Sequence, residues 1–337
     1  MSKSKLSLIP VTEKDSWDEL VRSSAQGSLF SERFYLAAVG GNHHYYFVKQ
    51  GTGTEIKAGV VVVVSEDDRT CELDDLVVYG GILFDLDPKR QIVKRRYDEF
   101  QIVEFVIEQF STIYDSVEFQ LSPQFGDMRP FQWYRYHDDY RYKFTLNLRY
   151  TSLVDISSLQ EFIDNEENSP CFKNMETVRR YSVRQARQKG GRITQANNGD
   201  QLIDFYQLLM ERQGESRSSA KLSSMKNVIN TLLKMDRGSV YHVLNSAKEV
   251  VYAVCYGWDS KRAYYLFGAG HPEVSEPWQG TLAHWEAFKD IAQRLSISEV
   301  DMEGVNSPQR GWFKLGFGGN LAPYYHVFKK NLPNDNQ

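Results

Sequence analysis

The sequence has few cysteines and no long apolar run. Its three cysteines, Cys71, Cys171 and Cys255, are widely spaced, and no two of them form a Cys-x-x-Cys pair. This spacing argues against a disulfide framework and predicts buried thiols in a reducing compartment. The longest apolar run, 58–64, is far too short to span a bilayer, and residues 1–10 lack a run of signal-peptide length. We therefore expect a cytoplasmic protein without stable membrane insertion.

The chain also lacks an overall basic charge and the usual metal and hydrolase motifs. Its net charge of −4 provides no general field for nucleic acid. No Cys/His/Asp cluster has ligand spacing, so we expect no metal, and neither a Ser-His-Asp nor a Gly-x-Ser-x-Gly pattern is evident. One local stretch, 178–191, is basic and ends at a Gly pair. Its Arg180, Arg184 and Arg187 fall on one helical face, which is either solvated or binds a phosphate-bearing ligand, namely a nucleotide sugar, coenzyme A or tRNA.

What the chain does have is an internal repeat, and 337 residues are enough for two domains. Each half has helices, three strands, a long helix, a strand, a short helix and a last strand. The apolar spacing of the long helix and the unbroken apolar run 59–64 within the strand 56–64 carry this prediction. In the first half the three strands are 44–50, 56–64 and 72–83, the helix is 98–114 and the next strand is 117–121. In the second half the corresponding elements are 239–245, 249–258, 262–270, 282–294 and 298–303.

Several short segments in this order resemble one family. Residues 127–133 read Asp-x-Arg-x-Phe-x-Trp, and the basic stretch 178–191 follows them. Three further segments complete the set: residues 264–268, Gly280 with 282–292, and Phe-Lys-x-x-Phe at 313–317. Together they resemble the FemAB-like and BioF2-like branch of the GNAT acyltransferases, over about residues 15–330.

The resemblance implies an α+β fold with two tandem GNAT domains, each a mixed, mostly antiparallel sheet flanked by helices. We expect the first domain at 1–150, a linker at 151–170 and a second, donor-binding domain at 171–337. The family has two chemistries. Some members move an amino acid from aminoacyl-tRNA onto a peptidoglycan precursor, and others resemble acyl-CoA transferases that act on amino sugars.

Attack of an amine on an activated acyl group requires a base and a group that stabilises the oxyanion. By resemblance, Lys314 would lie near the acyl group and stabilise the oxyanion, with Phe313 lining the same channel. Asp301 and Glu303 alternate with apolar residues on one strand and would share a face. We expect one of them to be the general base, with His284 as the next candidate.

The fold also implies where the substrates bind. The strand that contains Phe267 and Gly268 would present its backbone to the acyl arm, and free amides of Gly280, Thr281 and Leu282 would hold phosphate at a helix start. Aligned on Gly280, the usual phosphate-loop pattern is degenerate. The residues expected to bind the acceptor or to complete the cleft are Asp75, Tyr79, Arg129, Trp133, Tyr134, Arg184, His271 and Asn306.

The leading hypothesis is an N-acyltransferase that moves an acyl group, expected to be acetyl, from acyl-CoA as co-substrate. The acceptor would be the amino group of a nucleotide-linked amino sugar for surface polysaccharide such as O-antigen or capsule. The first alternative is aminoacyl-tRNA-dependent transfer to a peptidoglycan-precursor-type acceptor, supported by the arginine face. The second is a non-catalytic member that binds a sugar nucleotide or a partner protein.

Overall fold

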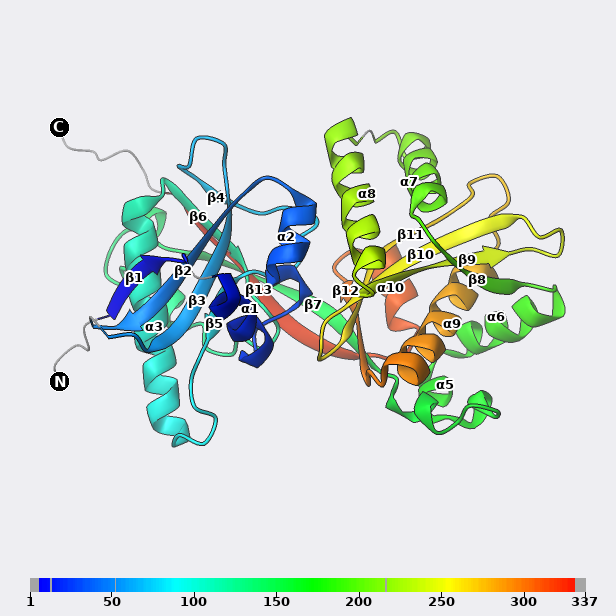
Figure 1. Cartoon of the computed structure of the whole chain (residues 1–337), viewed down its shortest axis with the longest axis horizontal. Helices are drawn as coiled ribbons and strands as arrows, with labels where there is room; N and C mark the ends of the chain where they lie inside the picture. Colours follow the sequence, from blue (N-terminus) through cyan, green and yellow to red (C-terminus); the bar gives the residue numbers. More distant parts are fainter. Residues whose placement is uncertain (1–5, 13, 52, 216, 331–337) are drawn as a thin grey trace. The chain divides into compact units, whose positions relative to one another are not determined.

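The computed structural model describes residues 6–12, 14–51, 53–215 and 217–330 (Figure 1). The chain divides into two compact units. In the described chain, unit 1 comprises residues up to 149 together with 323–330, and unit 2 comprises 150–322. Residues 151–170, expected to link the halves, thus lie in unit 2, and residues 323–330, expected in the second domain, lie in unit 1.

Unit 1 contains an antiparallel sheet of β1 (Leu6–Pro10), β2 (Asn42–Gln50) and β3 (Ile56–Val64). β3 also pairs with β4 (Cys71–Glu72) and β5 (Gly81–Phe84). Helix α1 (Lys14–Ser23) packs on this sheet where Gly59 lies, because a Cβ there would be 2.5 Å from the Leu20 side chain and 2.7 Å from Trp17. α2 (Arg33–Val39) follows.

The single strand expected at 72–83 is wrong, because the chain turns between β4 and β5. Asp74 makes this turn: its carboxylate accepts from the Leu76 amide at 2.7 Å, and its carbonyl accepts from the Val77 amide at 2.9 Å. An Asp that bonds the backbone two residues later favours a turn over a strand. Ser31 lies in a short 3-10 helix before α2, and Glu32 occupies the N-cap of α2.

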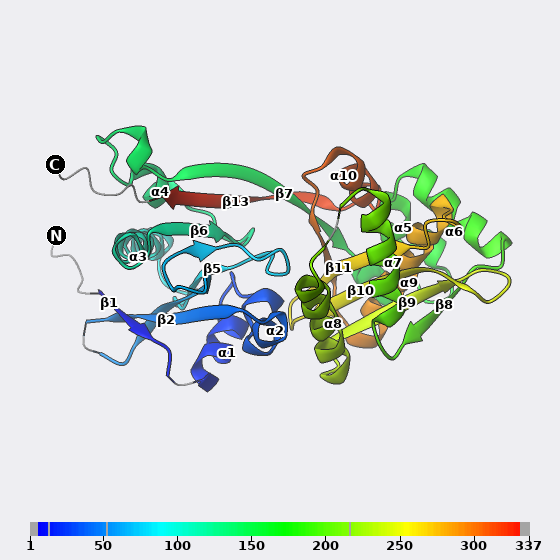
Figure 2. The same ribbon diagram turned by 90° about the horizontal axis from the view of Figure 1, so that it is seen from above.

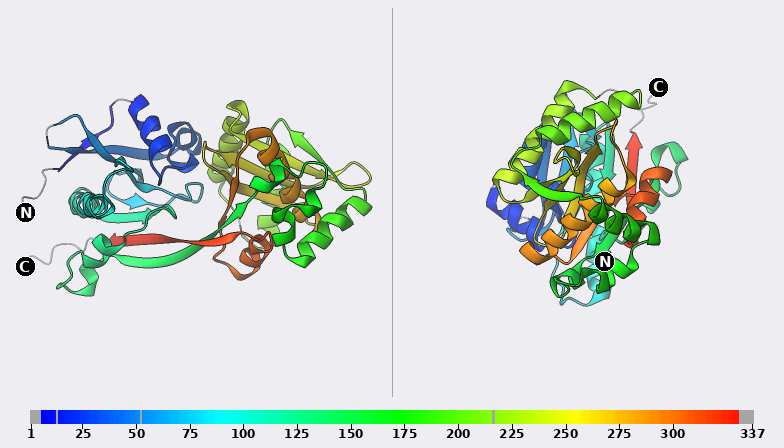
Figure 3. Two further views of the ribbon diagram at one scale, coloured as in Figure 1. Left: turned by 90° about the horizontal axis from the view of Figure 1, so that it is seen from below. Right: turned by 90° about the vertical axis from the view of Figure 1, so that its right-hand side faces the viewer.

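The long helix α3 (Ile92–Ile113) packs beside β6 (Ser116–Gln120), and Figures 2 and 3 show it end-on. Its buried face, which includes Val103, Val106 and Phe110, joins the core of unit 1. β6 then pairs antiparallel with the end of β13 (Asn320–Lys330), from His326 opposite Gln120 to Lys330 opposite Ser116. The last strand of the chain therefore completes unit 1. The short helix α4 (Arg129–Trp133) follows β6.

Unit 2 is built on a sheet in the order β7, β12, β11, β10, β9, β8. β11 and β12 run parallel, and the other neighbours are antiparallel. The strand bounds are Thr145–Asp155 for β7, Arg192–Ala196 for β8, Gly238–Leu244 for β9, Val250–Trp258 for β10, Ala263–Gly270 for β11 and Glu299–Gly304 for β12.

Helices cover both faces of the sheet in unit 2 (Figure 1). Alternate residues of β10 point to opposite faces. Val254 and Tyr256 pack in one core with α6 and α9, whereas Ala253 and Cys255 pack in another with α7 and α8. The helix bounds are Pro170–Asn174 for α5, Thr177–Gln188 for α6, Asp200–Arg212 for α7, Ser219–Lys234 for α8, Pro277–Leu295 for α9 and Pro308–Leu315 for α10.

The three cysteines are buried and unpaired, as the sequence predicts. Among the described residues, none of the helices is long and apolar enough to cross a membrane.

Candidate functional site

The candidate site lies in unit 2, where β11 and β12 share a short stretch of pairing. Their register pairs Ala263 with Val300 and Tyr264 with Asp301. Both strands are irregular next to this stretch. β12 has an extra residue between Asp301 and Gly304 opposite β7, and β11 has an extra residue opposite β10 near Tyr265. Such bulges re-aim the side chains beside them.

Asp301 holds the bulge of β12 in place. It is fully buried, and its Oδ1 accepts a short hydrogen bond from the Thr151 hydroxyl and one of 2.7 Å from the Glu303 amide. Glu303 has a φ of 55°, a left-handed conformation that a non-glycine residue rarely adopts. Because the bulge interrupts the regular alternation of β12, the assumption that Asp301 and Glu303 share a face through simple alternation does not hold. The bonds that Asp301 makes suit a positioning role.

Glu303 is the carboxylate with unused hydrogen-bonding capacity. Its Oε1 is buried and has no hydrogen-bond partner among the described residues. Burial raises the pKa of Glu303 well above its usual range, and the Asp301 charge raises it further, whereas Lys314 lowers it. A carboxylate with a raised pKa is better matched to accepting a proton near neutral pH.

Lys314 supplies the positive charge of the site from α10. Its Nζ donates to the Gly304 carbonyl at 3.2 Å and lies 5.1 Å from the centroid of the Tyr265 ring. Burial lowers the pKa of Lys314, and the charges of Glu303 and Asp301 oppose that shift. The charges of Glu303 and Lys314 thus interact, but no ion pair joins them in the described chain. Neither charge is therefore neutralised by a direct ion pair with the other.

His284 lies beside these groups in the core. It is fully buried on α9, and its Nδ1 lies 2.5 Å from the Tyr256 hydroxyl. Burial lowers the pKa of His284 to about 3, and the Lys314 and Arg179 charges add to this effect, so the ring is neutral at physiological pH. Phe313 and Phe317 pack against the ring at 5.5 and 5.2 Å. These contacts make His284 a supporting residue rather than a base that meets substrate.

The start of α9 differs from the expected phosphate site. The helix begins at Pro277, not near Thr281, so Gly280, Thr281 and Leu282 lie past the N-terminal residues whose amides are free. Their amides fall where the helix bonds each N–H to the carbonyl four residues earlier. Glu276 occupies the N-cap and pairs with Lys189, and Pro277 has no N–H. This helix start is therefore poorly suited to an anion.

The two glycines expected at the acyl carrier make room for tyrosines. A Cβ at Gly268 would come within 2.5 Å of the Tyr265 hydroxyl, and one at Gly280 would be 3.2 Å from the Tyr252 ring. Phe267 lies next to Gly268 on β11 and is half-buried. The aromatic composition of the sequence did not identify Tyr252 and Tyr265 as residues of the candidate site. Their packing against Gly280 and Gly268 in the structure identifies them.

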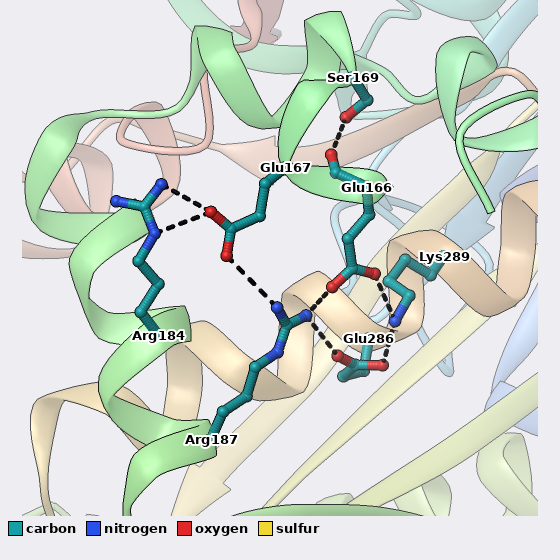
Figure 4. Close-up of polar contacts among 7 residues, drawn as sticks. All are labelled: Glu166, Glu167, Ser169, Arg184, Arg187, Glu286 and Lys289. Carbon is teal, nitrogen blue, oxygen red and sulfur yellow. Dashed lines mark hydrogen bonds and ion pairs between the residues drawn. The ribbon is translucent and has the colours of Figure 1, made fainter. Parts of the chain in front are cut away.

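Two of the three arginines on the basic face of α6, Arg184 and Arg187, are paired with glutamates (Figure 4). Arg184 binds Glu167 through two hydrogen bonds of 2.9 and 2.7 Å. Arg187 pairs with Glu166, which also holds Lys289 of α9 at 2.6 Å. The stretch 166–168 is thus fastened to both helices. Arg184 is committed to this network, which weakens the case for a phosphate-binding arginine face.

Two other expected residues of unit 2 make local contacts. The Asn306 side chain accepts from the Tyr150 amide at 2.8 Å and donates to the Tyr150 carbonyl at 3.1 Å, which fastens the end of β12 to β7. His271 packs edge-on against Phe205, and its Nδ1 accepts from the Glu273 amide at 3.3 Å. The structure gives both residues a local structural role.

The residues expected to bind the acceptor are dispersed within unit 1. Tyr79 is buried in the core. Arg129 forms two hydrogen bonds with Asp127, at 2.8 and 2.6 Å, and lies over the ring of the half-exposed Trp133. Tyr134 packs edge-on against Phe144. Asp75 lies exposed on the loop between β4 and β5.

A pocket of unit 1 lies beside that loop. Sequence reasoning missed most of its polar lining, because these side chains come from segments far apart in the chain. The lining residues include His43, Glu72, Asp74, Glu118 and Gln120. Among the described residues, no group of His, Cys, Asp and Glu side chains is arranged to hold a metal ion.

Comparison with known proteins agrees with this architecture. Residues 173–310 match the family model described as an acetyltransferase (GNAT) domain. FemX aligns with a TM-score of 0.62 at 12% identity, over 95% of this chain and 96% of FemX. A tandem GNAT protein from the clavulanic acid biosynthesis pathway aligns with a TM-score of 0.56 at 11% identity, over 98% and 100% of the two chains.

The chain has the tandem GNAT fold of the FemAB-like proteins. L-PGS from Bacillus licheniformis shares it, with a TM-score of 0.53 at 11% identity over 96% of this chain and 93% of that one. No curated protein matches the sequence. The resemblance noted in the sequence is thereby confirmed at the level of fold, and the α+β class with two GNAT-like domains is confirmed with it.

Proposed function

We propose that this tandem GNAT protein is an N-acyltransferase whose reaction takes place at Glu303 and Lys314. The observation that carries the proposal is that a half-buried carboxylate with an unpartnered, buried oxygen and a half-buried ammonium both lie next to the short pairing of β11 and β12. Acyl transfer to an amine needs these two groups, and a GNAT-type acyltransferase fold supplies the setting.

The proposed reaction begins when a neutral amine attacks the acyl carbonyl carbon and forms a new C–N bond. The carbonyl oxygen gains negative charge, and the Lys314 ammonium stabilises it by a charge-assisted hydrogen bond. Glu303 accepts the proton that the amine nitrogen loses. The C–S or C–O bond to the carrier then breaks, the carbonyl re-forms, and the departing sulfur or oxygen takes up the proton that Glu303 had accepted, directly or through water. The net result is an amide and the free carrier.

For the substrates, the first candidates are acetyl-CoA and the amino group of a nucleotide-linked amino sugar of surface polysaccharide. The FemAB-like resemblance supports this pair, since one branch of that family has this chemistry. The start of α9 does not fit the pyrophosphate of coenzyme A, because Glu276 caps it and Pro277 removes a donor. In this proposal the pyrophosphate therefore binds elsewhere.

The second candidate is transfer of an amino acid from aminoacyl-tRNA to a peptidoglycan-precursor-type acceptor. The same α9 start favours it, since this donor does not require a pyrophosphate there. The pairing of Arg184 and Arg187 with glutamates weakens the support that the arginine face lends to this reaction.

The test offers the protein acetyl-CoA with a panel of UDP- and dTDP-linked amino sugars, and, separately, radiolabelled aminoacyl-tRNA with a peptidoglycan precursor. Release of free thiol supports the first candidate, and transfer of label supports the second. Absence of both, together with binding of a sugar nucleotide, would instead support a non-catalytic binding protein and refute the proposal.

A further inference from the structure

Tyr265 lies on β11 between the charged and the neutral groups of the site. The Lys314 Nζ lies 5.1 Å from the centroid of its ring. The ring meets His284 edge-on, with centroids 4.5 Å apart and an interplanar angle of 89°. Its hydroxyl also interacts with that of Tyr252 on β10, since each affects the pKa of the other. One aromatic side chain thus contacts groups from three other elements.

The backbone around Tyr265 is adapted to this position. Tyr256 pairs with Tyr265 and Cys255 with Phe267, so Leu266 is the extra residue of the bulge in β11. Gly268 leaves space for the hydroxyl, because a Cβ there would lie 2.5 Å from it. A bulge and a close glycine, both next to one side chain, fix where its ring lies.

The Lys314 ammonium needs such a partner. It is partly buried, an ammonium loses hydration on burial, and its described hydrogen bond is to the Gly304 carbonyl. The face of an aromatic ring attracts a cation most strongly when the cation is desolvated. With one N–H on the carbonyl and the ring against the ammonium, a further N–H is left for an oxyanion.

We propose that Tyr265 is a positioning residue that holds the Lys314 ammonium in place for acyl transfer. The effect of Tyr265 on the reaction rate rests on the proposed function. Its effect on the pKa and position of the Lys314 ammonium does not.

Other charged groups also act on this ammonium. The carboxylates of β12 favour the charged form of Lys314, and Arg310 on its own helix disfavours it. The titratable and charged groups around Lys314 are Glu303 and Asp301 from β12, Arg310 from α10, His284 from α9, Arg179 from α6, Tyr265 from β11 and Tyr252 from β10.

The experiment measures how readily Lys314 reacts with a trace of acetic anhydride as the pH is raised, by mass spectrometry of the labelled peptide. The uncharged amine reacts, so the midpoint reports the pKa of Lys314 without any need for turnover. We expect Tyr265→Leu, which removes the ring, to lower this midpoint by about one pH unit. Tyr265→Phe keeps the ring and is expected to leave the midpoint within about 0.3 units.

Two further variants serve as controls in case the leucine variant misfolds. Pentafluorophenylalanine at position 265 keeps the ring's shape but removes its negative face, and is expected to lower the midpoint as Tyr265→Leu does. Tyr136→Leu removes a ring that lies 5.5 Å from Lys143 in unit 1 and is expected to leave Lys314 unchanged.

An unchanged midpoint in both ring-altering proteins would overturn the inference. So would a shift in Tyr265→Phe equal to that in Tyr265→Leu, since the hydroxyl rather than the ring would then be responsible. If the enzyme is active, the alkaline limb of kcat/KM moves with the labelling midpoint. If no donor is used but the midpoint still shifts, the proposed function fails and the role of Tyr265 stands.

Discussion

At the residue scale, the candidate site contains the opposite charges of Lys314 and Glu303, and no ion pair joins the two in the described chain. Lys314 donates to a backbone carbonyl, and one oxygen of Glu303 has no partner among the described residues. A charge that is already neutralised by a close partner has less to offer a transition state, so the lack of an ion pair matters for catalysis.

Lys314→Ala is expected to lower kcat about 10²- to 10³-fold, because a donor to the oxyanion is lost. Lys314→Arg should recover part of the activity, since the charge remains but its geometry changes. Steady-state kinetics with whichever donor proves active provides the measurement. Lys143→Ala, a lysine of unit 1, is the matched control, and equal losses in it and Lys314→Ala would contradict the assignment.

The acid limb of the pH–rate profile should report Glu303. The base must be ionised to accept the amine proton, and burial together with Asp301 raises its pKa. Activity therefore falls as pH drops through a value above the ordinary range of a glutamate. Glu303→Gln should reduce kcat about 10²- to 10⁴-fold and remove this limb. An unaltered limb in the residual activity of that variant would assign the base elsewhere.

His284 should make stability depend on pH. Its pKa is about 3 in the folded protein, against 6.5 for the ordinary side chain, so the unfolded state binds more protons between these values. Stability is then full above pH 6.5 and is lost as pH falls, by about 1.4 kcal/mol per unit. Between pH 7 and pH 5, His284→Gln should lose about 2 kcal/mol less than the wild type in urea unfolding. Parallel losses in the two proteins would show that other groups dominate.

At the scale of elements, the stretch 166–168 acts as a clamp between α6 and α9 (Figure 4). Glu166 is 9% exposed and binds both Arg187 and Lys289. Glu167 pairs with the more exposed Arg184.

Glu166→Ala is expected to lower the free energy of unfolding by about 1–2 kcal/mol, because two cations lose a buried partner. Lys289 keeps Glu286, and Arg187 keeps Glu286 and Glu167 at longer distances of 3.7 and 3.5 Å. The matched change Glu167→Ala, at a more exposed pair, should cost less than about 0.5 kcal/mol. Urea titration of both variants compares them. Equal effects would mean that burial does not set the strength of this clamp.

Regular elements were the part of the fold that the sequence could predict. The apolar spacing of 98–114 predicted α3, and the strand predicted at 56–64 from its apolar run 59–64 coincides with β3. The β-bulges could not be predicted from the sequence. The extra residue in β12 depends on the hydrogen bond between Thr151 of β7 and Asp301, which joins residues far apart in the chain. The helix start at Pro277 was not predicted for a similar reason. Gly280 was interpreted as part of a ligand site at the helix start, whereas it accommodates the Tyr252 ring, a contact with another element.

The candidate site could be predicted only through short motifs. Lys314, Phe313 and His284 do come together, because the elements that contain them pack against one another in unit 2. Arg184 and Asn306 do not join them, since each has a nearby partner that local sequence does not reveal. Tyr265 had no signal of its own among the many tyrosines of the chain.

At the scale of the whole molecule, the two units are not consecutive pieces of chain. β13 ends in unit 1, where Val327 is fully buried and pairs with Phe119. Ending the chain after residue 322 should therefore unfold part of unit 1 rather than trim unit 2. Hydrogen exchange of the β6 amides, 116–120, measures this, and we expect at least 10²-fold faster exchange, which corresponds to about 3 kcal/mol of lost protection.

A chain that ends after Lys330 keeps the whole described strand and serves as the control. If β6 is equally protected in both shortened chains, the strand pairing contributes little to unit 1.

The return of β13 also has a consequence for biosynthesis. A protein emerges from the ribosome in order, and its first domain commonly folds before the rest is made. Here the edge of β6 that pairs with β13 stays unpaired until residues 326–330 have been made, which is after every residue of unit 2. Synthesis of unit 1 thus starts before that of unit 2 and ends after it, so unit 1 is the unit that chaperones would have to shield.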